Sequence, residues 1–241
     1  SRHSSKFDFS DLCFFEPSIL FQQKRGATLV NVYLLNDELE DQFQKFKTEL
    51  EKGHQNVDVQ FPKLIARETK EEYIKAITQL KSEIQYGNIY EINYCQEFYA
   101  ENIDTDASDY YLELNKKSAM PFSAFYRNAQ DYLICASPER YLTKRGNELF
   151  SQPIKGTSKR GISAEEDQKI KAALQRDLKE QTENVMIVDL VRNDLSRTAE
   201  RGSVKVEELF GVYTFPQVHQ LISTVRSRLS SNYSFADSIK H

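Results

Sequence analysis

The chain alternates between segments in which apolar residues recur every three or four positions and segments in which they recur every second position. The first spacing is typical of amphipathic helices and the second of half-buried strands. A helix is predicted from Thr69, which forms a capping box with Glu72, to Gly87, a residue type that often follows the last helical turn. Its apolar positions are Tyr73, Ile77, Leu80 and Ile84.

Two further helices are predicted in the second half of the chain. A capping box of Ser163 and Glu166 begins a helix that includes Leu178. A break near residues 181–182 separates this helix from one over residues 184–195.

Strands are predicted where short apolar or alternating runs are bounded by polar turns. Strands and helices are mixed rather than strictly alternating, so the pattern favours an α+β fold over a doubly wound α/β sheet. The predicted strands are residues 12–15, 27–33, 89–100, 122–126, 132–136, 141–143, 149–152, 204–210 and 217–227, with a short helix at residues 43–52.

Composition limits the class of protein only broadly. The 241 residues carry a net charge of −4 with acidic and basic residues interleaved, so no concentrated basic face predicts a nucleic-acid partner. No apolar run is long enough to span a membrane. Cys13, Cys95 and Cys135 lack metal-ligand spacing, and we expect reduced, mostly buried thiols in a cytoplasmic protein.

The segment PIKGT at residues 153–157 predicts a turn that holds a lysine next to a binding surface. Pro153 fixes its own backbone, Gly156 permits the close approach of a ligand, and the hydroxyl of Thr157 can bind an oxyanion. A restrained and partly shielded amine at Lys155 is a nucleophile rather than a solvated charge. An exposed Lys-Gly turn is the alternative.

Glu139 follows a predicted strand at the point where Pro138 ends it. Catalytic groups are common at strand ends, and a partly desolvated carboxylic acid can serve there as a general acid. The alternative is a turn glutamate paired with Arg140.

Glu180 and Glu183 are three residues apart, so on a helix they share one face. Two carboxylates held together repel each other unless a cation lies between them. Mg²⁺ suits that place because it takes a few carboxylates and keeps water and substrate oxygens as its other ligands. The alternative is a solvated acidic face balanced by Arg176 and Lys179.

Two further polar residues lie in strand-like segments. His219 has apolar neighbours on both sides, which indicates a histidine close to the core, and such a histidine is more often structural than catalytic. Glu91 lies on the polar face of the strand predicted for residues 89–100, for which a solvated face is the simplest interpretation.

The order of these motifs resembles that of one enzyme family. GNIYEIN, SPER, PIKGT, ENVMIVDLVRNDL and HQLISTV follow one another between residues 87 and 225, and together they resemble the chorismate-utilising enzymes. This family includes anthranilate, aminodeoxychorismate, isochorismate and salicylate synthases, and the resemblance covers roughly residues 62–241. Lys155 is similar to the lysine of the aminodeoxychorismate synthase component I branch, because anthranilate synthases carry alanine there.

The resemblance implies a covalent mechanism. In that branch the lysine attacks C2 of chorismate while the C4 hydroxyl leaves by allylic rearrangement, and ammonia then displaces the lysine and leaves an amine at C4. Lys155 would be the nucleophile, Glu139 matches the acid that protonates the departing hydroxyl, and His219 matches a histidine near it. Gly156 and Thr157 match the substrate-binding part of the segment.

The resemblance also implies a metal and a protein partner. Glu180 and Glu183 match two acidic positions of a Mg²⁺ site, at which the metal holds the ring carboxylate of chorismate. Glu91 stands where many relatives have glutamine and places a further carboxylate near the substrate. A glutamine amidotransferase subunit would supply the ammonia for para-aminobenzoate and folate synthesis.

The fold implied by the resemblance is the chorismate-binding fold, in which packed antiparallel β-sheets are flanked by helices. We expect a chain truncated at both ends, with residues 1–60 the C-terminal part of an N-terminal subdomain and residues 61–241 a catalytic domain without its C-terminal portion. Such a chain holds part of the active site and alone catalyses little or no turnover. Two alternatives stay open: a different product (anthranilate, isochorismate or salicylate) and an inactive chorismate-binding module.

Overall fold

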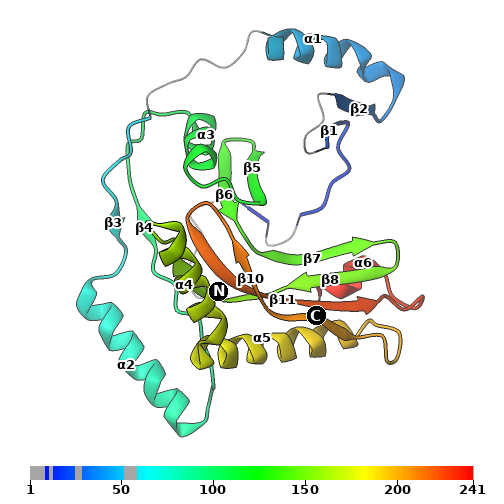
Figure 1. The fold of residues 1–241 in the computed structure, drawn as a ribbon. Helices are drawn as coiled ribbons and strands as arrows, with labels where there is room; N and C mark the ends of the chain where they lie inside the picture. Colours follow the sequence, from blue (N-terminus) through cyan, green and yellow to red (C-terminus); the bar gives the residue numbers. More distant parts are fainter. Residues whose placement is uncertain (1–8, 11–12, 25–28, 52–58, 241) are drawn as a thin grey trace. The chain divides into compact units, whose positions relative to one another are not determined.

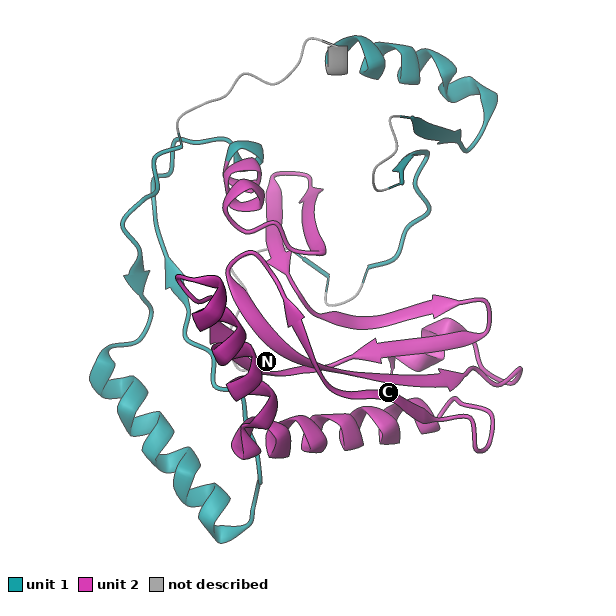
Figure 2. Ribbon diagram, in the orientation of Figure 1, with its two compact units in different colours: residues 1–109 teal, residues 110–241 magenta. Residues whose placement is uncertain are grey.

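The computed structural model describes residues 9–10, 13–24, 29–51 and 59–240 (Figure 1). The chain forms two compact units, residues 1–109 and residues 110–241 (Figure 2). Helix α3 (Ala107–Lys117) spans the boundary between them. The predicted division into residues 1–60 and 61–241 concerns the domains of the whole family fold and stays a prediction.

The first unit consists of short strands and two longer helices. Its longest element, α2 (Lys70–Tyr86), begins at the capping box of Thr69 and Glu72, and Gly87 ends it with a φ of 79°. Both ends of this helix confirm the prediction. The other elements are β1 (Ile19–Gln23), β2 (Val30–Leu34), the 3₁₀ turn η1 (Asp37–Leu39), α1 (Glu40–Glu51), β3 (Ile65–Ala66) and β4 (Phe98–Tyr99), in which β1 pairs with β2 and β3 with β4.

An antiparallel five-stranded sheet forms the centre of the second unit (Figure 1). Strand β11 (Val218–Arg228) pairs with β10 (Lys205–Thr214) on one side. On its other side β11 pairs with β8 (Glu148–Gln152) and with β9 (Ile154–Lys159), and β8 pairs with β7 (Arg140–Arg145). The remaining elements are the hairpin of β5 (Phe122–Asn128) and β6 (Asp131–Ser137) and the helices α4 (Ala164–Arg176), α5 (Leu178–Ser196) and α6 (Phe235–Ile239).

Strands β8 and β9 follow one line along β11 and are separated only by Pro153. The register between β8 and β11 continues unchanged into the start of β9 at Ile154, which pairs with Ile222. The carbonyl oxygen of Pro153 accepts a hydrogen bond of 3.2 Å from the amide of Ser223, although proline has no N–H to donate. The ladder therefore continues through the interruption.

Helices α4 and α5 pack against one face of the sheet, and this face holds the hydrophobic core (Figure 1). Successive residues of β11 point to opposite faces. The odd-numbered residues from His219 to Ser227 lie on the helix side, and none is more than 1% exposed. The core cluster is Leu149, Val188, Leu195, Val225 and Leu229.

The strands predicted from residue 122 onward are confirmed, as β5, β6, β7, β8, β10 and β11. The strand predicted for residues 89–100 is wrong except at β4, and residues 13–15 of the first predicted strand are irregular. An alternating pattern makes a strand only where a partner strand exists, and β3 offers β4 just two residue pairs. The strand predicted for residues 27–33 is confirmed as β2, apart from residues 27–28, which lie outside the described ranges.

The predicted helix break is displaced toward the N-terminus. Asp177, not residues 181–182, separates α4 from α5, and its carboxylate caps α5 by accepting hydrogen bonds from the amides of Lys179 and Glu180. The prediction missed this cap because the helical spacing of apolar residues continues through Leu178, across the break. None of the helices in the described part of the chain, α5 included, combines enough length and hydropathy to cross a membrane.

Two smaller predictions are also corrected. The hydroxyl of Ser163 accepts the amide of Glu166, but the Glu166 carboxylate bonds to the next amide upstream, that of residue 162, so the second capping box is only half formed. The cysteines are free, as predicted, but not mostly buried: Cys13 and Cys95 are exposed, and Cys135 is half-buried.

Candidate active site

Lys155 lies at a β-bulge in strand β9. Two residues, Lys155 and Gly156, stand opposite the single residue Leu221 of β11, and the register shifts by one at this point. Gly156 has a φ of 93°, a conformation that residues with a Cβ rarely adopt. The predicted turn is therefore a bulged strand, because pairing with β11 holds the backbone extended on both sides. Lys155 is half-buried, and bulges often re-aim side chains beside active sites.

The carboxylate of Glu139 contacts the strand that carries the lysine. Its Oε1 accepts a hydrogen bond of 3.0 Å from the backbone amide of Ile154. The amide of Glu139 in turn donates to the hydroxyl of Ser137 at 3.2 Å, which fixes the loop between β6 and β7. Glu139 is otherwise exposed. The carboxylate of the predicted general acid is thus bound to the backbone of Ile154, the residue that precedes Lys155.

Glu180 packs against Gly156, the residue that follows the lysine. A Cβ on Gly156 would lie 3.1 Å from the Cβ of Glu180, 3.2 Å from its Oε2, and 3.2 Å from the Cβ of Leu221. Only glycine leaves this contact undisturbed. The residues before and after Lys155 therefore contact Glu139 and Glu180, respectively.

Glu180 and Glu183 lie in the first turns of α5, as their predicted shared face requires, and they flank one ammonium group. Nζ of Lys179 lies 3.4 Å from Oε1 of Glu180 and 2.9 Å from Oε1 of Glu183. Hydrogen bonds to Glu183 and then to Glu180 raise the pKa of Lys179.

The pairing of both carboxylates with Lys179 matches the alternative interpretation, an acidic face balanced by basic side chains, and a Mg²⁺ site at these two residues stays a prediction. The two carboxylates converge on one cation, and Mg²⁺ binds through one or two carboxylates with water and substrate oxygens completing its shell. Over the described ranges, no three His, Cys, Asp or Glu side chains are grouped so that they could hold a metal by themselves. Glu180 and Glu183 would therefore supply two ligands, and Lys179 would have to give way.

His219 is fully buried, and both of its ring nitrogens have partners. Nδ1 lies 2.9 Å from Oγ1 of Thr214, and Nε2 lies 3.0 Å from Oδ1 of Asp167 on α4. Only 1% of the residue is exposed. The predicted position close to the core is confirmed, and neither ring nitrogen is left over for a substrate.

Asp167 holds this buried network together and was not singled out from the sequence. Arg160 donates a hydrogen bond of 2.8 Å to each carboxylate oxygen, and the amide of Gly161 donates a third, also of 2.8 Å. The guanidinium and then the amide lower the pKa of Asp167 well below its usual range. The one available signal was an arginine at the end of a strand with an aspartate in the first turn of the next helix. The network fastens the end of β9 to α4.

The two remaining predicted binding residues are placed differently. Thr157 lies on β9, two residues beyond Lys155, and is exposed. Glu91 lies in the first unit, half-buried in a segment without regular structure, and its role near the substrate stays a prediction.

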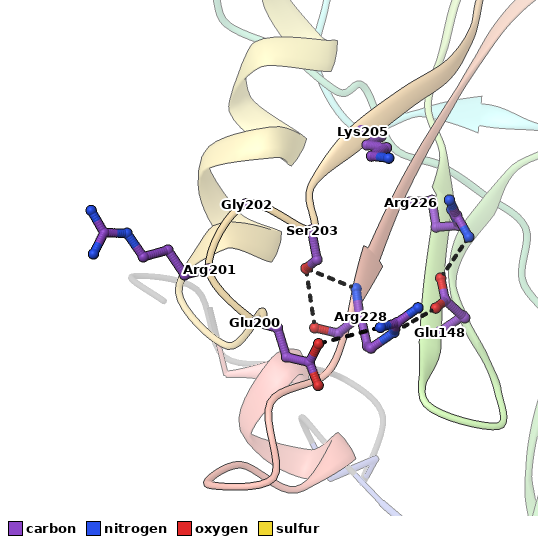
Figure 3. Close-up of a pocket in the computed structure, with 8 residues that line it drawn as sticks. All are labelled: Glu148, Glu200, Arg201, Gly202, Ser203, Lys205, Arg226 and Arg228. Atoms are coloured by element: carbon purple, nitrogen blue, oxygen red, sulfur yellow. Dashed lines mark hydrogen bonds and ion pairs between the residues drawn. The ribbon is translucent and has the colours of Figure 1, made fainter.

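A cavity of about 270 Å³ lies at the C-terminal end of β11 and is lined mostly by charged side chains (Figure 3). Glu148 accepts hydrogen bonds of 3.0 Å from Arg226 and from Arg228, and these bonds, that of Arg228 first, lower the pKa of Glu148. Arg201 points away from the cavity (Figure 3). Because both central arginines already have carboxylate partners, we assign this cluster a structural role at the end of the sheet.

The fold is shared with solved enzyme structures. It matches the crystal structure of anthranilate synthase component I from Streptococcus pneumoniae TIGR4 with a TM-score of 0.75 and 25% sequence identity, over 87% of this chain and 49% of that chain. The family model for chorismate binding enzymes matches residues 2–241, and the chain belongs to this family. The predicted α+β class and the resemblance drawn from the motif order are both confirmed.

The curated relatives include aminodeoxychorismate synthases. The chain is 39% identical over 172 residues to aminodeoxychorismate synthase component 1 of Escherichia coli (strain K12), which covers 71% of this chain and 38% of that protein. It is 42% identical over 171 residues to aminodeoxychorismate synthase of Streptomyces griseus, which covers 70% of this chain and 23% of that protein. The chain thus spans less than two-fifths of the length of either relative.

Proposed function

We propose that this chain is part of component I of an aminodeoxychorismate synthase, which converts chorismate and ammonia to 4-amino-4-deoxychorismate. One observation carries the proposal: the residue before Lys155 bonds to Glu139, and the residue after it packs on Glu180. Covalent displacement needs this combination of a nucleophile, an acid for the leaving group and a carboxylate on the metal side. Because the chain spans only part of its relatives, the activity is proposed for the whole protein.

In the proposed first step, the amine of Lys155 forms a bond to C2 of chorismate, the ring double bonds shift, and the C4–O bond breaks. Glu139 gives its proton to the departing hydroxyl, which leaves as water. In the second step ammonia bonds to C4, the double bonds shift back, and the C2–N bond breaks to free Lys155. The nitrogen becomes positively charged as ammonia bonds to C4, and Glu139 recovers its proton from this new ammonium group, so the net change is the exchange of water for ammonia.

The other predicted residues would bind and orient the substrate. Mg²⁺ held by Glu180 and Glu183 would offset the charge of the ring carboxylate. The amide of Gly156 and the hydroxyl of Thr157 would donate hydrogen bonds to the substrate. We place no proton transfer on His219, because both of its nitrogens are occupied and it would act only by holding β11 in place.

Replacement of Lys155 by alanine in the full-length protein tests the proposal. With chorismate, ammonium and Mg²⁺, we expect formation of 4-amino-4-deoxychorismate to fall by at least about a hundredfold, the lower end of what a positioned catalytic group contributes. Mass spectrometry of the unaltered protein should show a gain equal to chorismate minus water, and K155A should lack it. An unchanged product formed at an unchanged rate would refute the proposal.

Anthranilate synthase component I is the second candidate, favoured by the match to the Streptococcus pneumoniae structure. The product of the unaltered full-length protein separates the two, because anthranilate carries its amine at the ring carbon that Lys155 would attack. A switch of K155A toward anthranilate would support the first proposal.

The proposal includes a glutamine amidotransferase partner, which the name component 1 of the Escherichia coli relative supports. We expect free ammonium to sustain the reaction without this partner and glutamine to sustain it only with the partner. Turnover with glutamine by component I alone would contradict that part of the proposal.

A further inference from the structure

We infer that Gln220 binds the substituent at C4 of the substrate and so determines which molecules can react. The inference rests on the proposed function. It starts from an unusual side chain: Gln220 is 9% exposed, and its Oε1 is buried without a hydrogen-bond partner. A buried acceptor left without a donor destabilises the fold, so such an atom calls for a donor from outside the chain.

Gln220 and His219 point to opposite faces of the sheet, because side chains alternate along a strand. His219 points toward α4 and uses both nitrogens there. Gln220 points to the face away from the helices. His219 thus joins the sheet to α4, whereas Gln220 lies on the opposite face, where we infer that it contacts a ligand.

The neighbours of Gln220 on its own face are the residues that pair with it directly. These are Thr157 on β9 and Tyr213 on β10, and directly paired residues of an antiparallel ladder share one face. The resulting row of a hydroxyl, a carboxamide and a phenol crosses three strands, two residues beyond Lys155. Thr157 is exposed and Tyr213 is 39% exposed, so solvent reaches both ends of this row, while Gln220 between them is nearly buried.

Neither neighbour satisfies the orphan oxygen. The phenol of Tyr213 donates to the carboxylate of Glu208, and this bond raises the pKa of Tyr213. The hydroxyl of Thr157 has no side-chain partner over the described ranges, and in the proposed function it donates to the substrate rather than to Oε1. The donor that Oε1 lacks therefore comes with the ligand.

The chemistry of the reactants then selects the ligand group. The two carboxylates of chorismate can only accept hydrogen bonds, so neither can serve Oε1. The donors among the reactants are the C4 hydroxyl that leaves and the ammonia that enters, and both act at C4. The terminal torsion of a glutamine side chain is soft, so the carboxamide can turn toward such a donor when the substrate arrives.

This assignment has a mechanistic consequence. A carboxamide does not titrate and cannot protonate a leaving group, so Gln220 orients the C4 substituent while Glu139 alone supplies the proton. The pH profile of kcat should therefore keep its shape when Gln220 is replaced. It should change when Glu139 is replaced.

Equilibrium binding tests the inference without turnover. In full-length protein carrying Lys155→Ala, which prevents the covalent step, Gln220→Leu should weaken the binding of chorismate by about tenfold, because one hydrogen bond is worth about 1 kcal/mol or more in a dry site. The same change should leave the binding of a chorismate analogue without the 4-hydroxyl within about twofold.

Thr224→Val is the matched control, since Thr224 lies on the same face of β11 and bonds to Gln152 instead. It should leave both dissociation constants unchanged, and circular dichroism should show all variants folded. Equal losses for chorismate and for the analogue, or no loss for either, would overturn the inference. If Gln220→Leu weakens the binding of chorismate but not of the analogue, and the unaltered full-length protein forms no 4-amino-4-deoxychorismate, the proposed function alone would be overturned.

Discussion

The backbone amide of Ile154 donates a hydrogen bond of 3.0 Å to the carboxylate of Glu139 and so joins the loop after β6 to the strand that carries Lys155. The bond needs an oxygen acceptor at position 139 but not a negative charge. A mutation at position 139 can therefore remove the acidic proton and still keep the hydrogen bond to Ile154.

Glu139→Gln should keep the bond to Ile154 and lose the acid. We expect kcat of the full-length protein to fall by about 10²–10⁴-fold, the range for a positioned general acid, while stability stays within about 0.5 kcal/mol of the unaltered protein. Steady-state kinetics and urea unfolding measure the two effects. Glu139→Ala should lower both quantities, and a glutamine variant with near-normal kcat would exclude Glu139 as the acid.

Gly156→Ala should destabilise the protein more than Gly202→Ala does. Both glycines have positive φ, 93° and 76°, so each substitution carries a backbone cost of about 1 kcal/mol or more. Only at position 156 would the new Cβ press on Glu180 and Leu221, whereas nothing lies within 4 Å at position 202. Urea unfolding measures the difference, and equal effects would show that the contact with Glu180 is not tight.

Lys179→Met should strengthen Mg²⁺ binding by about fivefold, since a unit charge at 4 Å is worth about 1 kcal/mol in water and the ammonium competes with the metal for both carboxylates. Glu183→Gln should weaken binding by a similar factor or more. Calorimetric titration of the full-length protein with MgCl₂ measures both. Lys169→Met is the control, because Lys169 pairs with Glu165 at the same four-residue spacing on α4. A parallel change in the control would contradict a metal site at Glu180 and Glu183.

Stability should depend on acid through Asp167. Arg160 and the Gly161 amide lower the pKa of Asp167, so the folded state keeps this carboxylate ionised at pH values at which the unfolded chain binds a proton. The stabilisation is fully present above the ordinary aspartate pKa of about 4 and is lost as the pH falls below it. Asp167→Asn should lower the free energy of unfolding at pH 7. It should also make that free energy fall less steeply as the pH is lowered.

Urea unfolding at a series of pH values between about 2 and 7 checks this expectation. Asp189→Asn is the control, because Asp189 is 74% exposed in its pair with Arg192 and such pairs contribute little. An acid dependence that is the same with and without Asp167 would contradict the role assigned to the Arg160–Asp167–His219 network.

Helix caps and the alternation of apolar residues predicted much of the fold, because these patterns depend on interactions between residues close together in the sequence. Thr69, Glu72 and Gly87 set the ends of α2, and the strands from residue 122 onward follow from alternation bounded by turns. Lys155 and Glu139 were predicted as separate motifs, and a hydrogen bond from the backbone amide of Ile154 to the Glu139 carboxylate joins their segments.

The rest depends on partners that a local pattern does not contain. Residues 89–97 alternate like a strand but pair with no strand among the residues that the structure describes. Asp167 matters because Arg160 and His219 reach it from other elements. The side of β11 on which His219 and Gln220 fall depends on which face α4 covers, and a residue pattern alone does not specify this.

The bulge in β9 places Lys155 outside the regular pairing that aligns this strand with β11. At Lys155 the ladder skips one pairing, and the residues on either side of the bulge, Ile154 and Thr157, keep the strand aligned with β11. The pairing of β9 with β11 thus does not require a particular side chain at position 155. On the proposed function, a substitution of Lys155 would then change the reaction and leave the pairing of the sheet as it was.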